Sequence, residues 1–262
     1  MTTSMRLALA ALAVPLATAA FAQSLNWKQM PGSANDIGVG PTGEVWAIGT
    51  DGSNEFGIHR FYPVGSMPPI TAYTVFPVKP TPVAFWVKVP GSAVRIDVGP
   101  EGPWVVNAAG GIYKWNGRAW DHMPGEAVDV GVGADGSVWV IGRIPEPGGY
   151  GIYRWTGSNW NKIPGSASRI DVDPRGNAWV VTSGNAIFRY DGTKFVPVPG
   201  AATDIGIGAE GSVFIVGTDG GVHKWNGSTW VKRDGGFTNI SVDNAGRPWG
   251  VNASKQVWWG DR

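Results

Sequence analysis

Residues 160–194 read WNKIPGSASRIDVDPRGNAWVVTSGNAIFRYDGTK, the clearest copy of a pattern that recurs along the chain. Within it the segments IDV, AWVV and AIFRY, followed by FVPVPG at 195–200, are short and rich in β-branched and aromatic residues. Turns that contain glycine, such as 174–176 and 191–192, separate them. Short apolar segments bounded by Gly and Pro are typical of β-strands joined by tight turns. The stretch therefore predicts four antiparallel strands.

The same pattern recurs along the chain. An aromatic residue followed closely by Pro-Gly, or once by Asp-Gly, marks the start of each copy, with spacings of 59, 34, 40, 35 and 35 residues. A repeat of this length made of four strands is typical of a β-propeller, because one small sheet cannot bury both of its faces alone. We predict an all-β, six-bladed propeller of four-stranded antiparallel blades over residues 23–262. The copies begin at Trp27, Trp86, Trp120, Trp160, Phe195 and Trp230.

The two ends of the repeat region complement each other. The last copy stops at residues 256–262, QVWWGDR, where every other copy continues into an outer strand. Residues 25–30, LNWKQM, supply an outer strand with no copy of its own. We therefore expect the N-terminal strand to complete the last blade and to close the ring, which removes two open strand edges.

The repeated pattern Trp-x-x-(Ile/Val/Met)-Pro-Gly-x-Ala-x-x-Ile-x-Val-(Gly/Asp)-x-x-Gly-x-x-Trp-x-Val resembles the tectonin repeat. The resemblance covers nearly all of the chain from Trp27 to Arg262. It implies a six-bladed propeller. It also implies a function among those of tectonin-like propellers, which include lectins for lipopolysaccharide sugars, N-acetylglucosamine or O-methylated glycans and modules that bind only proteins.

Composition narrows the classes of partner. Residues 1–22 are typical of a signal peptide, with Arg6, an apolar run and a small-x-small site ending at Ala22. Cleavage there predicts a periplasmic or secreted protein, and no later stretch is long and apolar enough for a membrane span. The chain has 21 basic and 20 acidic residues and no cysteine. Loss of Arg6 leaves it formally neutral, which argues against nucleic acid as a partner.

One column of the repeat alternates in charge. Three copies carry Asp-x-Gly in the first strand and two carry Arg-x-Asp, whereas the last carries Asn239 and Ser241. Both members of a pair lie on one side of the strand, because strand side chains alternate. We expect an axial ring of ion pairs with a structural role, and a ligand site on the axis is the alternative. The ring residues are Asp36, Arg95, Asp97, Asp129, Arg169, Asp171 and Asp204.

Two further columns are candidates for glycan binding. The second strand carries an aromatic residue in each copy, which either packs between blades or stacks on the apolar face of a sugar. The third strand carries a basic residue in five copies and Trp259 in the sixth, so these residues either contact a glycan or are simply solvated. We predict carbohydrate contacts at Trp46, Trp104, Trp139, Trp179, Trp249, Lys114 and Arg154.

The sequence favours binding over catalysis. Two of its three histidines, His59 and His223, share one repeat column with aromatic residues, and no nucleophile elbow or zinc-protease motif is present. We predict no enzyme activity, no cofactor and no metal site. The favoured function is an exported lectin-like propeller that recognises cell-surface glycans through repeated sites between blades. The alternative is a protein-interaction or envelope scaffold, for which the proline-rich insertion at 63–85 offers a partner-binding arm.

Overall fold

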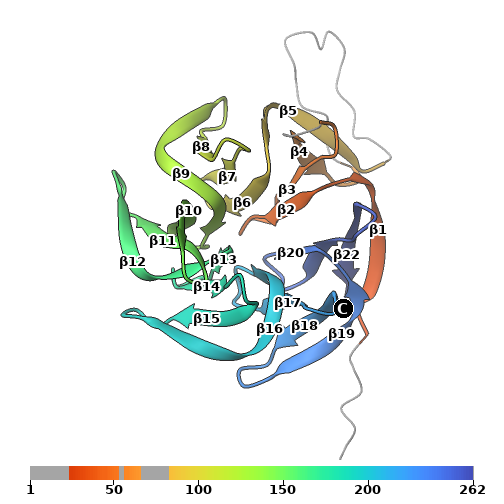
Figure 1. Ribbon diagram of the computed structural model, residues 1–262. Coiled ribbons are helices and arrows are strands. Elements are labelled where there is room, and N and C mark those ends of the chain that lie inside the picture. Colours follow the sequence, from red (N-terminus) through yellow and green to blue (C-terminus); the bar gives the residue numbers. More distant parts are fainter. Residues whose placement is uncertain (1–23, 53–55, 66–82, 262) are drawn as a thin grey trace, which may run out of the picture.

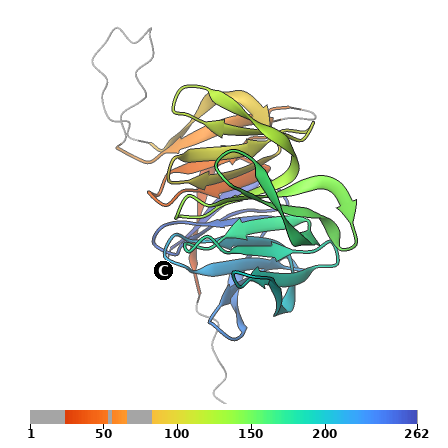
Figure 2. The same cartoon turned by 90° about the vertical axis from the view of Figure 1, so that its left-hand side faces the viewer.

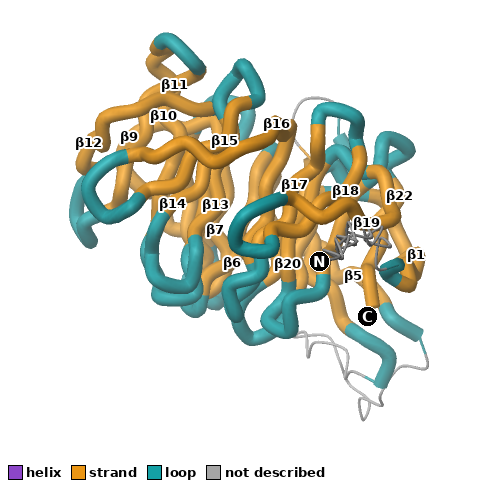
Figure 3. The backbone as a smooth tube through the Cα atoms, turned by 90° about the horizontal axis from the view of Figure 1, so that it is seen from below, coloured by secondary structure: helices purple, strands orange, loops and turns teal. Residues whose placement is uncertain are grey.

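The computed structural model describes residues 24–52, 56–65 and 83–261. Figure 3 shows the described chain as strands joined by loops and turns, with no helix in these ranges. The all-β prediction is therefore confirmed. The predicted signal peptide at 1–22 and most of the 63–85 insertion lie outside the described residues.

The strands form six units of four antiparallel strands each, numbered here along the chain. In each unit the first strand lies nearest a central axis and the fourth lies at the rim, as Figure 1 shows for β2 and β5. The strands of the first three units are β2 (Asp36–Val39), β3 (Val45–Ile48), β4 (Phe56–Tyr62) and β5 (Phe85–Ala93) in unit 1; β6 (Arg95–Gly99), β7 (Gly102–Val106), β8 (Gly111–Trp115) and the first half of β9 (Trp120–Val132) in unit 2; and the second half of β9, β10 (Val138–Glu146), β11 (Gly149–Trp155) and β12 (Trp160–Ala167) in unit 3.

The remaining units repeat this order. Strand β16, like β9, runs from the rim of one unit to the axis of the next, which joins two units into one seven-stranded sheet. The strands are β13 (Arg169–Val172), β14 (Ala178–Val181), β15 (Ala186–Tyr190) and the first half of β16 (Phe195–Ile207) in unit 4; the second half of β16, β17 (Val213–Gly217), β18 (Gly221–Trp225) and β19 (Trp230–Gly236) in unit 5; and β20 (Asn239–Val242), β21 (Pro248–Val251), β22 (Gln256–Asp261) and β1 (Asn26–Ser33) in unit 6.

Unit 6 is built from both ends of the described chain. Strand β1 pairs antiparallel with β22, with Asn26 opposite Asp261 and Trp27 opposite Gly260. The short strand β1 thus covers the edge of β22 that would otherwise lie open.

The hydrophobic core lies between units and not within them. Figure 2 shows the sheets of successive units facing one another. Six apolar clusters fill the spaces between neighbours; one of them joins Ile37 and Phe61 of unit 1 to Trp249 and Val257 of unit 6. Small four-stranded sheets gain stability by burying both faces against neighbours.

The repeated Trp-x-x-x-Pro-Gly motif places a hydrogen bond between neighbouring rim strands. In five of the six copies the indole N–H of the tryptophan donates to the main-chain carbonyl at the proline position of the preceding unit, with N···O distances of 2.6–2.7 Å. The glycine that follows has a positive φ, and at Gly200 a Cβ would lie only 2.8 Å from Trp230 Nε1. Glycine is therefore required there by both conformation and space. Phe195 packs at the sixth position without a donor.

Candidate functional site

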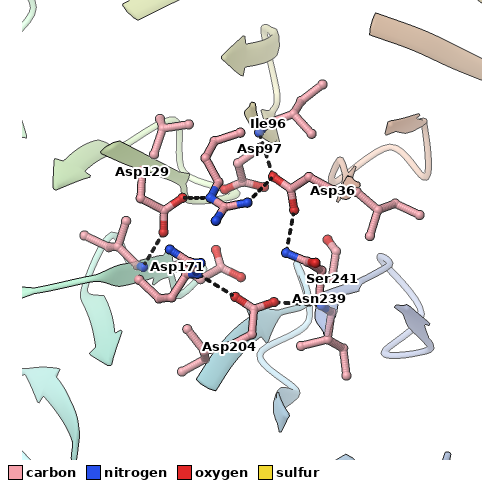
Figure 4. Close-up of a pocket in the computed structure, with 15 residues that line it drawn as sticks. Asp36, Ile96, Asp97, Asp129, Asp171, Asp204, Asn239 and Ser241 are labelled. Atoms are coloured by element: carbon pink, nitrogen blue, oxygen red, sulfur yellow. Dashed lines mark hydrogen bonds and ion pairs between the residues drawn. The ribbon is translucent and has the colours of Figure 1, made fainter. Parts of the chain in front are cut away.

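The seven charged residues of the predicted axial ring line one central cavity, together with Asn239 and Ser241 (Figure 4). Arg95 lies between two carboxylates, with Nε 3.7 Å from Asp129 Oδ1 and Nη1 4.0 Å from Asp36 Oδ2. Arg169 Nε lies 3.6 Å from Asp204 Oδ1. The ion pairs that the alternating column predicts are therefore present in this cavity.

Each side chain of the ring also connects one unit to the next. Asp36 accepts from the main-chain N–H of Ile96 at 3.0 Å, and Asp97 accepts from that of Val132 at 2.6 Å. Equivalent bonds join all further pairs of neighbouring units. They run from Ile170 N–H to Asp129, from Ile207 N–H to Asp171, from Ile240 N–H to Asp204 and from Val39 N–H to Ser241 Oγ.

The glycines of the alternating column give these bonds room. A Cβ on Gly131 would lie 3.0 Å from the Asp171 Cα, and one on Gly206 would lie 2.7 Å from the main-chain oxygen of Ile240. The innermost strands of neighbouring units therefore approach closely at the glycine of each Asp-x-Gly motif. This close approach is the physical reason for glycine in the Asp-x-Gly copies.

The substituted residues of unit 6 still bond to unit 1. Asn239 takes the place of arginine and donates from Nδ2 to Asp36 Oδ1 at 3.1 Å. Ser241 takes the place of aspartate and still accepts the bond from Val39. Because one arginine and one aspartate are lost together, the net charge of the cavity is unchanged by the pair. The amide of Asn239 thus takes the place of a guanidinium beside Asp36.

The cavity holds five carboxylates and two guanidinium groups. Burial raises the pKa of Asp36 to about 6, although Arg95 opposes the shift. Burial likewise raises the pKa of Asp97 to about 7, against the hydrogen bond from Val132, and that of Asp204 to about 7, against Arg169. Removing carboxylates from water favours their neutral form, and an excess of like charges adds to this effect.

The axial cavity is too small for a sugar. Its volume is about 30 Å³, which suits two or three water molecules at most, since one water needs roughly 10–15 Å³ on this scale. Among the described residues, no three His, Asp or Glu side chains are placed to hold a metal ion. The geometry thus favours the structural interpretation of the ring.

The tryptophans of the second-strand column are buried. Trp46, Trp104, Trp139, Trp179 and Trp249 have exposed fractions between 0% and 6%. In the sheet, four of them lie opposite the basic residue of the third strand, and its cation sits 5.3–5.7 Å from the ring centroid. Such cation–π contacts stabilise the pair.

In the structure a cation and packed neighbours cover the rings of Trp46, Trp139 and Trp179. Carbohydrate contact at these rings stays a prediction, and it would require the cation to move. Arg154, predicted as a polar contact, instead lies over Trp139 and bonds to Ser137 Oγ at 3.4 Å. The sequence showed both columns but not that one covers the other.

A groove of about 120 Å³ lies between units 2 and 3 and includes two of the predicted residues. Trp104 and Lys114 form one wall, and Trp155 of the next unit forms the other. The Lys114 ammonium sits over Trp104 and forms an ion pair with Glu101. The groove is therefore narrow, and its cation is already partnered.

The equivalent groove between unit 6 and unit 1, named here the seam groove, has a volume of about 410 Å³. Trp249 takes the place of Trp104, Trp259 that of Lys114, and Phe61 that of Trp155. Met30 adds apolar surface, and the described ends of the insertion, Pro63, Val64 and Ala84, also line the groove. Ligand pockets commonly have volumes of about 300–1,000 Å³, so this groove is large enough for a small ligand.

Polar groups at the seam groove come from the β20–β21 turn. Arg247 Nε donates to Asp243 Oδ2 at 2.8 Å, and Asp243 Oδ1 accepts from the main-chain N–H groups of Ala245 and Arg247. Asp243 is buried and saturated, so its role is to position the guanidinium, which lies 4.7 Å from the centroid of Trp259. Sequence reasoning missed Arg247 and Met30. The one visible signal was tryptophan in the basic column at Trp259.

Comparisons with known proteins agree with this architecture. The Tectonin domain family matches residues 72–146, 148–201 and 175–261, more than half of the chain. Tectonin-1 of Physarum polycephalum is 38% identical over 60 residues, which are 22% of this chain. The match spans 28% of Tectonin-1, less than a third of its length.

Two solved structures share the fold. One is the WD40 β-propeller domain of Doa1, with a TM-score of 0.57, 10% identity and coverage of 93% of this chain and 98% of that chain. The other is YCF48 bound to D1 peptide, with a TM-score of 0.55, 15% identity and coverage of 92% and 99%. Among the described residues no helix is long and apolar enough to cross a membrane. The propeller fold predicted from the repeats is confirmed, and the extent of the family match shows that the chain belongs to the tectonin family.

Proposed function

We propose that the protein is an exported, lectin-like propeller that binds cell-surface glycans and acts by binding, not by catalysis. Export rests on the signal-peptide pattern of residues 1–22 and predicts a periplasmic or secreted location. Glycan binding is suggested by membership of the tectonin family and by the seam groove. The glycan classes to test first are lipopolysaccharide cores and N-acetylated or O-methylated sugars.

The scaffold in this proposal is a closed ring of six blades, one for each unit. Three observations support closure between unit 6 and unit 1. An apolar cluster joins the two units, Trp86 Nε1 donates to the carbonyl of Pro31 at 2.6 Å, and Val39 N–H donates to Ser241 at 3.1 Å. The apolar clusters and the axial bonds recur between all the other units, and the indole bond recurs at four of those five interfaces. A closed ring holds the walls of the seam groove in a fixed arrangement.

The observation that carries the proposal is the aromatic residue at Trp259. At this column five units place a cation over the second-strand aromatic ring, whereas unit 6 places an indole beside Trp249 at 6.1 Å between ring centroids. The groove that results is wide, largely apolar and bordered by one positioned arginine. An apolar floor with a few fixed polar groups is typical of small-molecule sites. Sugar rings and their methyl or acetyl groups have such apolar faces.

The experiment is binding of the purified protein to a broad glycan array, including lipopolysaccharide cores and methylated sugars. The decisive variant is Trp259→Lys, which restores the residue type of the other units and is expected to close the groove with a cation over Trp249. We expect loss of the array signal with the fold retained. Arg154→Lys, which keeps the cation over Trp139, is the matched control and leaves binding unchanged.

Two outcomes contradict this assignment. Binding that survives Trp259→Lys but is lost when a regular groove is altered at Lys114 would move the site away from the seam. Absence of any glycan signal at high protein density would favour a protein partner instead.

A protein partner is the second candidate function, and one observation favours it. Val64 and Val83, at the two described ends of the 63–85 insertion, are 66% and 62% exposed. Exposed large apolar side chains beside an apolar groove are typical of interaction sites. The change Val83→Asp, at the exposed end that does not line the seam groove, is expected to weaken capture of a protein partner while leaving glycan binding intact.

A further inference from the structure

A second groove lies on the same seam between unit 6 and unit 1, at the opposite end of strand β3. The seam groove includes Gly43, before β3, whereas the second groove includes Thr50, after it. Its volume is about 230 Å³, below the ~300–1,000 Å³ typical of drug-sized ligands, so it suits a single small ring. The side chains that line it are those of Ser33, Ala47, Thr50, Asp51, His59 and Trp86.

The imidazole of His59 is fixed in one orientation. Its Nδ1 lies 3.1 Å from the main-chain oxygen of Gly57, and a carbonyl oxygen only accepts, so Nδ1 carries the proton. In the neutral ring Nε2 is then an acceptor. A Cβ on Gly49 would lie 2.8 Å from His59 Cε1, so glycine is needed to leave space beside the ring. The groove thus contains a positioned hydrogen-bond acceptor.

Asp51 adds a second acceptor whose charge is balanced. Lys88 Nζ lies 2.5 Å from Asp51 Oδ2, and the main-chain N–H of Gly57 donates to Oδ1 at 3.1 Å. The hydrogen bond from Lys88 lowers the pKa of Asp51, so the carboxylate stays ionised. Its charge disfavours an anionic ligand, and the ammonium beside it disfavours a metal cation. An uncharged ligand that donates hydrogen bonds fits both groups.

Trp86 forms an apolar wall that is held in place. Its indole Nε1 donates to the carbonyl of Pro31 at 2.6 Å, and its ring packs against Phe61 with 5.0 Å between centroids. The ring is half-buried, and the exposed hydroxyls of Ser33 and Thr50 border the same groove. An indole beside fixed acceptors and hydroxyls is suited to a ring that has one apolar face and several hydroxyl groups.

Unit 5 repeats the polar residues in a different arrangement. Asp219, His223 and Lys232 stand at the positions of Asp51, His59 and Lys88. There the imidazole Nε2 faces its own aspartate at 3.7 Å, and Lys232 lies 3.4 Å from the carboxylate. In unit 1 the imidazole bonds to Gly57 instead. The cluster of Asp219, His223 and Lys232 in unit 5 therefore provides a control with the same residue types.

We infer that this second groove binds an uncharged, hydroxyl-bearing ring, such as one hexopyranose residue, as a site separate from the seam groove. Ring hydroxyls donate to His59 Nε2 and to Asp51, and the apolar face of the ring packs on Trp86. The seam between units 6 and 1 then carries two sites at opposite ends of β3, one larger and more apolar, one smaller and more polar. The inference does not depend on a ligand at the seam groove.

The test is a titration followed by nuclear magnetic resonance of the tryptophan indole N–H groups. The probes are the methyl glycosides of glucose, mannose and N-acetylglucosamine, with sodium sulfate and calcium chloride as charged comparisons. We expect at least one glycoside to shift the Trp86 signal with a dissociation constant in the millimolar range, and neither salt to do so. His59→Phe removes one acceptor and should weaken binding roughly fivefold, whereas His223→Phe should leave it unchanged.

Thr50→Val gives a second, conservative variant at an exposed position, and it should weaken binding even if His59→Phe fails to fold. The inference is overturned if no glycoside shifts Trp86, if a salt does so in place of the sugars, or if the two histidine variants have equal effects. Signals of Trp249 and Trp259 report the seam groove separately. A Trp86 shift that persists in Trp259→Lys would support the second groove even where the seam groove binds nothing.

Discussion

The seam groove and the groove between units 2 and 3 occupy the same position of the repeat, yet they differ more than threefold in volume, about 410 against 120 Å³. In the regular groove Lys114 covers Trp104 and pairs with Glu101. At the seam Trp259 replaces the lysine, and the turn residue Arg247 lies over Trp259 instead. Similar backbones thus give a nearly filled groove in one place and an open one in another.

The difference separates two kinds of constraint on the chain. Apolar clusters, rim tryptophans and axial side chains must recur at every unit, because each interface depends on them. Groove residues are free to vary, because the interface is already formed beneath them. A repeat position that departs from its column without weakening the interface is therefore where ligand binding is expected.

The largest effect should come from removing a tryptophan of a regular interface. Trp139 is fully buried, donates to the carbonyl of Gly176 at 3.1 Å and packs against Tyr190. Trp139→Ala should lower the free energy of unfolding by about 3–5 kcal/mol. Trp259→Ala, at the half-buried seam position, should cost less than half as much. Denaturant titration of both variants measures this, and equal losses would show that the seam is packed like any other interface.

A smaller but measurable effect should follow from the axial carboxylates. Burial raises the folded pKa of Asp97 and Asp204 to about 7 and that of Asp36 to about 6, above the ordinary value of 3.8. The folded protein then binds more protons than the unfolded chain between about pH 4 and 7, so stability is complete below this window and falls as pH rises through it. Most of the loss of stability should therefore fall between about pH 5 and 8.

Unit 6 supplies the comparison for this pH dependence, because Ser241 stands where Asp97 stands in unit 2. Asp97→Ser should keep the bond from Val132 N–H and reduce the slope of unfolding free energy against pH. Denaturation curves at several pH values for both proteins measure the slope. A protein that becomes more stable from pH 5 to 8 would contradict the raised pKa values.

The smallest effect should be the loss of one rim hydrogen bond. Trp86→Phe at the seam and Trp160→Phe between units 2 and 3 each remove an indole bond of 2.6 Å to a proline carbonyl. Each change should lower the free energy of unfolding by about 1 kcal/mol. The reverse change, Phe195→Trp, adds an indole donor and should raise the free energy of unfolding by part of that amount. Equal losses of unfolding free energy at Trp86 and Trp160 would indicate that the indole bond stabilises the seam as much as a regular interface. A much smaller loss at Trp86 would indicate that the ring opens there.

Much of the architecture could be predicted from the sequence, because strands, turns and repeats are local patterns. The spacing of Trp and Pro-Gly predicts the units, and the unmatched strand at residues 25–30 predicts the pairing of β1 with β22. The alternating Asp-x-Gly and Arg-x-Asp pairs predict that these residues meet, because equivalent strands face a common axis. Residues that repeat must play the same structural part in each copy.

The candidate sites depended on distances between units, which no single copy contains. The all-β repeat, the alternating charges of Asp36 and Arg95 and the exceptional indole at Trp259 can all be read from the sequence. The packing of the sheets is needed to see that Lys114 covers Trp104 and that Arg247 reaches the seam groove. It is also needed to see that His59 faces a cavity while His223 faces Asp219. Local pattern fixes which strands form, whereas groove volume depends on how side chains from two sheets fill the space between them.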